Sequence, residues 1–192
     1  MSFSDIWLYI KSDYYRYYGG DIQQLKKGGV KITLKIWKLA LSPINKSFQF
    51  TFWLRLAQHK NPFYFLARLV YWHLSTKYQV HLSRHSKIGY AFKIAHFTPM
   101  VINWKTEFGD NCTVFQFCSV GSVSGGAAKF GNNVYIGPHA SIVGEVNIGN
   151  NVTIGAGSVV TKDIPDNATV VGAPARIVSL EPKNYVTYYW TT

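Results

Sequence analysis

A six-residue repeat runs through the second half of this chain, and it constrains the fold more than any other feature. Glycine often follows the apolar anchor of each repeat, and a small or β-branched residue stands two positions before it. Six residues supply one short strand and one corner, so three repeats close a triangular coil whose anchors stack into a buried column. The pattern predicts a mainly β fold, a parallel β-helix. Its anchors are Ile88, Ile94, Ile102, Phe108, Val114, Val120, Phe130, Ile136, Ile142, Ile148, Ile154 and Val160.

The repeat is interrupted at two points. Two extra residues follow Ile94 and four follow Val120. Insertions into a solenoid form surface loops, often on the face that binds ligands. The first insertion contains His96, and the second is the small, glycine-rich stretch 122–128. We therefore expect the functional residues to lie at these two interruptions.

The repeat also divides the chain. Residues 1–79 lack it and are predicted to form an α-helical N-terminal domain, followed by the β-helix at 80–178 and a C-terminal tail at 179–192. The net charge of +11 belongs mostly to the first part, since residues 1–80 hold 12 Lys and Arg against 3 Asp and Glu.

A row of lysines marks one predicted helix of the first domain. Its members share a helical face opposite Ile32, Ile36 and Leu39. Such a row is typical of a helix on an anionic membrane surface or against an acidic glycan, and equally of a solvated face on a helix bundle. No nucleic-acid-binding motif accompanies it, so nucleic acid is not an expected partner. The row consists of Lys27, Lys31, Lys35 and Lys38.

The cysteines and the ends of the chain indicate its compartment. Cys112 and Cys118 both fall at small interior positions of the repeat, which predicts reduced core residues. The N-terminus lacks the features of a signal peptide, and no apolar run reaches membrane-spanning length. We expect a cytoplasmic protein, with peripheral contact at the inner face of the membrane if the lysine row binds lipid.

His96 is the candidate catalytic residue, because histidine serves as a general base near neutral pH. The outward aromatic residues Phe97 and Trp104 follow it in the sequence. Gln116 falls one coil above His96, about 4.8 Å away by the usual strand spacing, and could position an acceptor. The alternative is a surface histidine without a role beneath a stacked surface amide.

Several segments between about Val80 and Val178 are more specific than the repeat itself. They are Ile-Ala-His-Phe at 94–97, Val-Ile-Asn at 101–103, Gly-Asp-Asn-Cys-Thr-Val at 109–114, Ile-Gly-Asn-Asn-Val-Thr-Ile-Gly-Ala-Gly-Ser-Val-Val at 148–160 and Val-Val-Gly-Ala-Pro-Ala-Arg at 170–176. On these segments the chain resembles the hexapeptide acyltransferases, in particular the serine acetyltransferases and the capsule or colanic-acid O-acetyltransferases. The hexads alone indicate only a β-helix, whereas the resemblance at 148–160 and 170–176 is specific for enzymes that use acetyl-CoA.

The resemblance implies a left-handed coil and a homotrimer with active sites between subunits. It places the catalytic histidine at His96 and implies acetyl-CoA as the donor, with no metal. It also implies that coenzyme A lies along a groove near Gly121, Ala140, Gly155 and Ala156, with Lys162 and Arg176 as candidate partners of its phosphates.

The chain departs from the serine enzymes where they carry charge. An aspartate precedes their catalytic histidine and an Arg-His pair follows their glycine-rich loop, whereas Ala95 and Gly126–Ala127 occupy these positions here. Their histidine-orienting acid aligns with His81. Free serine needs both an anionic and a cationic partner, while a neutral sugar needs neither and stacks on aromatic rings such as Trp104. We therefore expect a saccharide acceptor, as in capsule, exopolysaccharide or O-antigen synthesis.

Three alternatives remain open. The first is a serine O-acetyltransferase of cysteine biosynthesis. The second is a metalloenzyme of the carbonic-anhydrase type, which needs three histidines around zinc. His96 and His139 fall two coils apart by the repeat, too far to share one metal within a subunit. The third is a non-catalytic scaffold.

Overall fold

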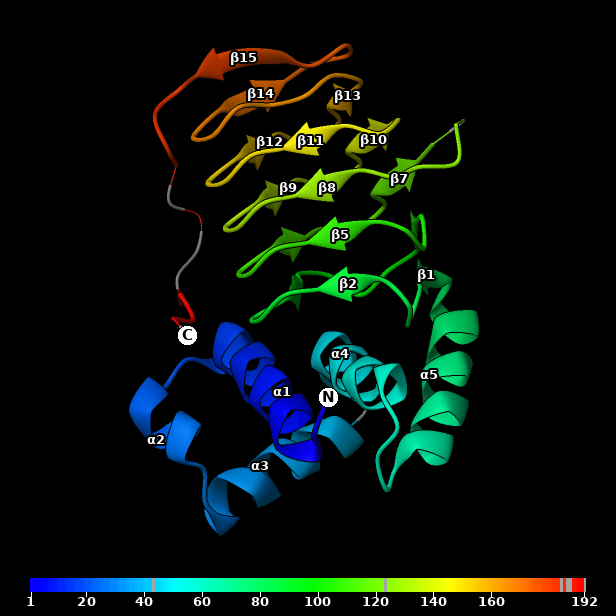
Figure 1. Cartoon of the computed structure of the whole chain (residues 1–192), viewed down its shortest axis with the longest axis vertical. Coiled ribbons are helices and arrows are strands. Elements are labelled where there is room, and N and C mark those ends of the chain that lie inside the picture. The colour runs from blue at the N-terminus through cyan, green and yellow to red at the C-terminus, as the bar shows by residue number, and fades with distance from the viewer. Residues whose placement is uncertain (43, 123, 184, 186–187, 192) are drawn as a thin grey trace.

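A computed structural model describes residues 1–42, 44–122, 124–183, 185 and 188–191. Its N-terminal part is a bundle of helices beneath a three-sided coil (Figure 1). Side-chain caps fix where three helices begin: Ser2 and Asp5 form a capping box, Asp21 accepts from Gln23 and Gln24, and Asn45 accepts from Phe48. The helices are α1 (Phe3–Tyr18), α2 (Ile22–Lys27), α3 (Val30–Leu41), α4 (Lys46–Gln58) and α5 (Tyr64–Tyr78).

The coil consists of three parallel sheets, and the chain passes from sheet A to sheet B to sheet C in each turn (Figure 1). Sheet A contains β1 (Val80–Leu82), β4 (Met100–Ile102), β7 (Ser119–Gly121), β10 (Ser141–Val143) and β13 (Val159–Val160). Sheet B contains β2 (Lys87–Ile88), β5 (Glu107–Phe108), β8 (Lys129–Phe130) and β11 (Asn147–Ile148). Sheet C contains β3 (Lys93–Ile94), β6 (Thr113–Val114), β9 (Tyr135–Ile136), β12 (Thr153–Ile154), β14 (Thr169–Val171) and the antiparallel β15 (Arg176–Ser179).

The repeat explains this coil residue by residue. The predicted anchors are buried, and successive anchors pair in register, as Ile94 does with Val114. One corner of each coil places Asn111, Asn133, Asn151 and Asn167 at positive φ, a conformation that asparagine tolerates. Asn151 accepts a hydrogen bond from the Asn133 side chain and donates one to that of Asn167, both at 2.9 Å. Side-chain hydrogen bonds therefore connect successive corners. The expected left-handed parallel β-helix behind an N-terminal helical domain is confirmed.

A buried ion pair fastens the helices to the first coil. The Arg55 guanidinium on α4 contacts the Asp13 carboxylate on α1 through Nε at 2.8 Å and Nη2 at 3.0 Å. Arg55 also donates to the carbonyls of Ile88 and Gly89, at 2.8 and 2.6 Å. Asp13 in turn accepts from the backbone N–H of Phe92 at 2.8 Å. Two helices and the first turn of the coil therefore share one charge cluster.

The C-terminal segment returns along the coil to the helices (Figure 1). Asn111 binds the backbone of Trp190 twice, donating to its carbonyl at 3.1 Å and accepting from its N–H at 2.8 Å. Arg16 donates to the Tyr188 carbonyl at 3.2 Å. The Trp190 side chain is buried, so this end of the chain is part of the folded core.

Both cysteines are buried, so they occupy the interior positions that the repeat predicted. Burial raises the pKa of the Cys112 thiol to about 12 and that of Cys118 to about 11, because the interior disfavours a thiolate. Within the described residues, no helix is both long and apolar enough to cross a membrane.

Candidate active site

His96 lies where sheet C passes into sheet A, at the first interruption of the repeat. We call this corner the histidine edge, formed by residues 95–99, 115–118, 137–140 and 155–158. The Ala95 N–H donates to the Val114 carbonyl at 2.9 Å, which fixes the backbone directly before His96. The imidazole is exposed, and its centroid lies 5.8 Å from that of the Phe115 ring. The chain therefore presents an accessible imidazole at the surface, two residues after β3 ends.

Three polar side chains of the same edge lack hydrogen-bond partners among the described residues: Thr98, Gln116 and, in the core of the coil, Ser158. Gln116 Oε1 and Thr98 Oγ1 are buried and make no hydrogen bond to any described residue. Backbone hydrogen bonds connect successive coils at this edge. The Phe117 N–H donates to the Pro99 carbonyl and the His139 N–H to the Gln116 carbonyl, both at 3.0 Å. Buried polar atoms without partners are costly, so those of Thr98 and Gln116 indicate a place where a ligand would supply the missing bonds. The sequence singled out Gln116 but not Thr98.

The predicted aromatic residues do not gather around His96 in one chain. Phe97 packs 5.1 Å from both Phe50 and Tyr78, so it joins the histidine loop to the helices. Phe117 stacks on His139 at 4.8 Å. Trp104 is exposed beyond the far end of β4, at the opposite edge of sheet A. The expectation that these rings would cluster about the histidine is therefore wrong within a single chain.

His81 lies on the outer face of sheet A, where β1 pairs it with Val101. In the described part of the chain, the His96 imidazole makes no hydrogen bond, either to His81 or to a carboxylate. Packing against Phe115 is the contact that limits its orientation.

The second interruption lies where sheet A passes into sheet B. We call this corner the loop edge, formed by residues 103–106, 144–146, 161–163 and the described part of 122–128. A cavity of about 350 Å³ lies there. Its wall includes Trp104, Gly126 and Ala127 together with several charged side chains. These are His85, Lys87, Lys105, Glu107, Lys129 and Glu145.

Glu145 takes a central place in this cavity. Its Oε1 accepts from the Gly126 N–H at 3.0 Å and from the Ser124 hydroxyl at 2.8 Å. Lys105 donates to the Gly125 carbonyl, and Lys129 lines the same wall. Charges of both signs therefore surround Gly126–Ala127, although the loop itself carries none. The sequence analysis missed Glu145, because it stands one coil above the loop and only the register of the coil brings it there.

The residues predicted to bind coenzyme A divide between the two edges. Gly155 and Ala156 lie at the histidine edge, whereas Gly121 and Lys162 lie at the loop edge. Arg176 begins β15, next to Val171. Gly155 has a packing role as well, since a Cβ there would stand 2.7 Å from Val171 Cγ1.

Ala140 requires a correction. Its side chain is fully buried, its N–H donates to the Gly137 carbonyl, and its carbonyl accepts from Ser119. It occupies the small interior position of the repeat, where a larger side chain would overfill the coil. Ala140 therefore belongs to the core and not to a coenzyme A surface.

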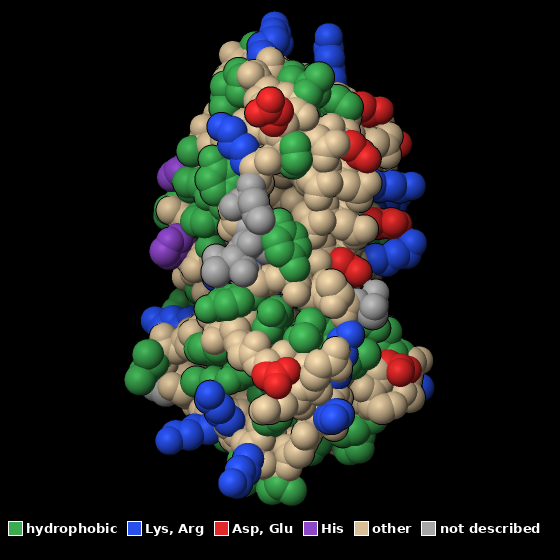
Figure 2. Space-filling model, turned by 90° about the vertical axis from the view of Figure 1, so that its left-hand side faces the viewer, with side chains coloured by type: hydrophobic (Ala, Val, Ile, Leu, Met, Phe, Trp, Pro, Cys, Tyr) green, Lys and Arg blue, Asp and Glu red, His purple; other side chains and the backbone are tan. Residues whose placement is uncertain are grey.

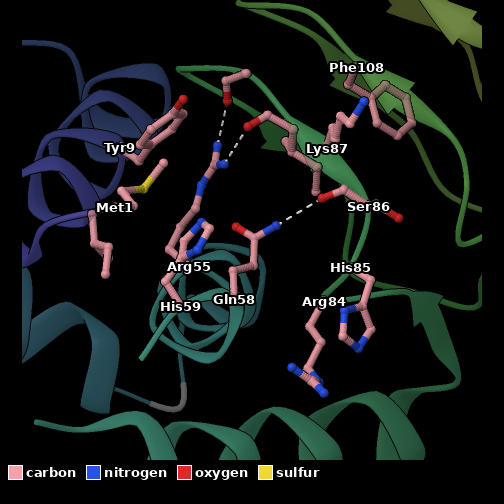
Figure 3. A pocket seen from close by; sticks show the side chains of 13 residues that line it. Met1, Tyr9, Arg55, Gln58, His59, Arg84, His85, Ser86, Lys87 and Phe108 are labelled. Carbon is pink, nitrogen blue, oxygen red and sulfur yellow. Dashed lines mark hydrogen bonds between the residues drawn. The ribbon is translucent and has the colours of Figure 1, made fainter. Parts of the chain in front are cut away.

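A larger cavity, about 520 Å³, lies between the helices and the base of the coil (Figure 3). None of the predicted site residues lines it. Arg55 is its most central charge, but the guanidinium is already bound to Asp13 and to two carbonyls, and Gln58 donates to the Ser86 carbonyl at 3.0 Å (Figure 3). Arg55 and Gln58 thus connect α4 to the base of the coil.

Metal ligation has no support in the described residues, where no group of three or more His, Cys, Asp or Glu side chains is placed to hold an ion.

Comparison with known proteins places the chain. Residues 127–162 match the family described as bacterial transferase hexapeptide (six repeats). The serine acetyltransferase of Helicobacter pylori strain J99 is 34% identical over 131 residues, covering 64% of this chain and 74% of that protein. The serine acetyltransferase of Bacillus pumilus strain SAFR-032 is 38% identical over 128 residues, and the match spans only 58% of its length and 64% of this chain. The chain therefore belongs to the serine acetyltransferase family of hexapeptide-repeat transferases.

Solved structures agree with this assignment. Neisseria gonorrhoeae serine acetyltransferase in complex with serine is 28% identical, with a TM-score of 0.69 over 90% of this chain and 69% of that one. A serine acetyltransferase in complex with CoA is 25% identical, with a TM-score of 0.64 over 88% of this chain and 68% of that one.

These relatives overturn one prediction. The missing charges at Ala95 and Gly126–Ala127 suggested a saccharide acceptor, yet the relatives at 34–38% identity are named serine acetyltransferases. The expected kinship to capsule and colanic-acid enzymes is likewise unsupported. The inference considered charges on the loop alone, whereas Glu145 and Lys105 from neighbouring coils, and Lys129 directly after the loop, line the same cavity.

Proposed function

We propose that the chain transfers an acetyl group from acetyl-CoA to the hydroxyl of serine. The observation that carries the proposal is an exposed histidine at the interruption of the repeat, in a chain whose relatives are serine acetyltransferases. The complex of one such relative with serine, and of another with CoA, supports the choice of both substrates.

The proposed reaction assigns His96 the role of general base. Its neutral imidazole accepts the proton of the serine hydroxyl as that oxygen attacks the thioester carbonyl of acetyl-CoA. Collapse of the tetrahedral intermediate breaks the carbon–sulfur bond, and the imidazolium returns its proton to the departing thiolate. The products are O-acetylserine and coenzyme A. The unpartnered Thr98 and Gln116 oxygens are suited to accept hydrogen bonds from substrate groups beside the base.

The charged ends of serine require partners, because an ammonium or carboxylate is costly to desolvate alone. We assign the Glu145 carboxylate to the ammonium and the Lys105 and Lys129 amines to the carboxylate. All three side chains line the loop-edge cavity. They supply the charges that Ala95 and Gly126–Ala127 lack.

A functional site of this kind joins two chains. His96 and Gly155 lie at one edge of sheet A, whereas Trp104, Glu145 and Gly121 lie at the other. Packing of the histidine edge of one copy against the loop edge of the next would unite them, and closed repetition of that contact gives the homotrimer.

Glu145→Gln should raise the KM for serine about tenfold or more, because a charged hydrogen-bond partner contributes about 1.5–3 kcal/mol. The amide oxygen can still accept from Gly126 and Ser124, so the loop stays in place. Release of coenzyme A from acetyl-CoA, measured with a thiol reagent over a range of L-serine concentrations, gives this value.

Glu107→Gln is the matched control, because Glu107 lines the same cavity but pairs with Lys87 at 2.8 Å. Its KM for serine should stay close to wild type. If L-serine accelerates thiol release no more than buffer does, the proposed acceptor is wrong. If serine reacts but Glu145→Gln behaves as wild type, the acceptor stands and only the role of Glu145 fails.

Mixing two inactive variants should restore activity if the site lies between chains. His96→Ala disables one edge and Glu145→Arg the other, so each trimer that contains both variants would hold one intact site, about a third of the wild-type number. The two variants are co-expressed with different tags, and doubly tagged oligomers are isolated and assayed. If the doubly tagged protein is as inactive as its parents, both edges serve the same chain.

A further inference from the structure

Helix α3 buries only part of its circumference. Ile36 and Ala40 are fully buried, and Ile32 and Leu39 are half-buried beside them. This side packs on the bundle, which is what we expected if the lysines simply form the solvated face of a bundle helix. The opposite side carries two exposed rows, one apolar and one basic.

The apolar row is unusually exposed. Val30, Leu34 and Leu41 lie on one face at helical spacing, and Ile44 follows the end of the helix. Their exposed fractions are 76%, 63%, 64% and 91%. Large aliphatic side chains exposed together mark a surface that another apolar phase covers.

Aromatic rings extend this row onto the neighbouring elements. Trp37, half-buried on α3, lies 5.2 Å from Phe63. Phe63 is 6.2 Å from Phe3, near the start of α1. Both phenylalanines are exposed, so one apolar surface runs from α3 to the start of α1.

The basic row lies directly beside the apolar one. Lys31, Lys35 and Lys38 are all exposed, and at 100° per residue they follow the apolar row around the helix. The prediction that Lys27 shares this helix is wrong, because Lys27 ends α2 and Gly28 and Gly29 separate it from α3. Figure 2 displays one face of the molecule, where Lys and Arg side chains project from the lower, helical part with hydrophobic side chains among them.

The surrounding sequence contains no acidic residue. From Ile22 to Thr106 there are 14 Lys and Arg residues and no Asp or Glu. Of the three acids in the preceding segment, Asp13 is buried in its ion pair with Arg55. Asp5 and Asp21 are the other two, so the basic charge of this face is offset only in small part within the domain.

We propose that the α3 face, formed by Val30, Leu34, Leu41, Ile44 and the adjoining lysines, binds the surface of an anionic lipid bilayer. A helix with an apolar row beside a lysine row lies in the plane of the membrane interface, with its apolar side chains at the boundary between headgroups and acyl chains. The lysines then contact acidic headgroups, each favourable near the surface. This inference goes beyond the proposed reaction and does not depend on it.

The charge of the α3 face argues against a second copy of the chain as its binding partner. Docking two α3 faces would bring lysine rows together, with no carboxylate between Ile22 and Thr106 to separate them. An acidic glycan would neutralise the lysines but leave the apolar row in water. An anionic bilayer satisfies both rows at once.

Sedimentation of the full chain with lipid vesicles tests the proposal. Binding is expected to vesicles of phosphatidylcholine mixed with phosphatidylglycerol and not to phosphatidylcholine alone, and added salt should weaken it. Lys31→Gln/Lys38→Gln should reduce binding about tenfold or more, because each lysine near the surface contributes to attraction. Leu34→Gln/Leu41→Gln should reduce it similarly while leaving the charge unchanged.

Lys162→Gln/Lys183→Gln, the coil variant, removes the same charge from the coil and from the segment that follows β15, and should bind as wild type does. All four replaced α3 residues are exposed, so the variants should fold, and thermal unfolding checks this. Equal sedimentation with neutral and anionic vesicles, or equal weakening by the coil variant, overturns the proposal. A third outcome also overturns it. If Leu34→Gln/Leu41→Gln still binds both anionic vesicles and soluble polyglutamate, the apolar row contributes nothing to binding.

Discussion

His96→Ala is expected to lower kcat for acetyl transfer to serine by about two orders of magnitude or more, because it removes the general base. The side chain is exposed and makes no hydrogen bond within the described chain, so its removal should leave the fold intact. Thiol release at saturating acetyl-CoA and serine measures the loss. Gel filtration and thermal unfolding should match the wild-type protein.

His73→Ala is the matched control, because His73 is an exposed histidine on α5, outside both edges of the coil. It should retain wild-type turnover. Nearly unchanged turnover in His96→Ala would exclude His96 as the base. A loss of coenzyme A binding equal to the loss of turnover would instead assign His96 to donor binding.

Asp13→Asn is expected to lower the free energy of unfolding by about 3–5 kcal/mol, because it leaves the buried Arg55 charge without its partner. The carboxylate and the guanidinium are both almost completely buried. The same change weakens the junction at Phe92, whose N–H donates to Asp13. Urea unfolding followed by circular dichroism gives the difference.

Two further variants define the effect. Asp13→Asn/Arg55→Met removes both charges and should recover part of the loss, as a double-mutant cycle would report. Lys87→Gln breaks an exposed ion pair with Glu107 and should cost no more than about 1 kcal/mol. If Asp13→Asn costs as little as Lys87→Gln, the buried pair does not hold the domains together.

The coil was predictable because its determinants are local and repeated. Each hexad independently indicates where a strand, a corner and a core residue lie, so the stacking of Ile94 on Val114 could be predicted from the sequence. The position of His96 at an interruption followed from the same count.

The parts of the site that sequence missed depend on contacts between coils and between domains. Phe97 turns toward Phe50 and Tyr78, and nothing in the repeat encodes that packing. Glu145 reaches Gly126 from the coil above, across an insertion whose path no periodicity describes. The sequence revealed the lysines of α3 but placed Lys27 on the same helix, whereas Lys27 ends α2. It also did not show that the bundle leaves Val30 and Leu34 exposed beside those lysines.

The return of the C-terminal segment alters how the molecule should come apart. In a stacked coil each turn touches only its neighbours, so the end farthest from the helices would ordinarily fray first and alone. Here the chain leaves that end and is pinned at Trp190 by Asn111 and at Tyr188 by Arg16. Opening the last strands therefore also affects the C-terminal segment, whose far end contacts α1 and the first coils. We therefore expect the two ends of the coil to unfold together, with the all-or-none cooperativity of a globular domain.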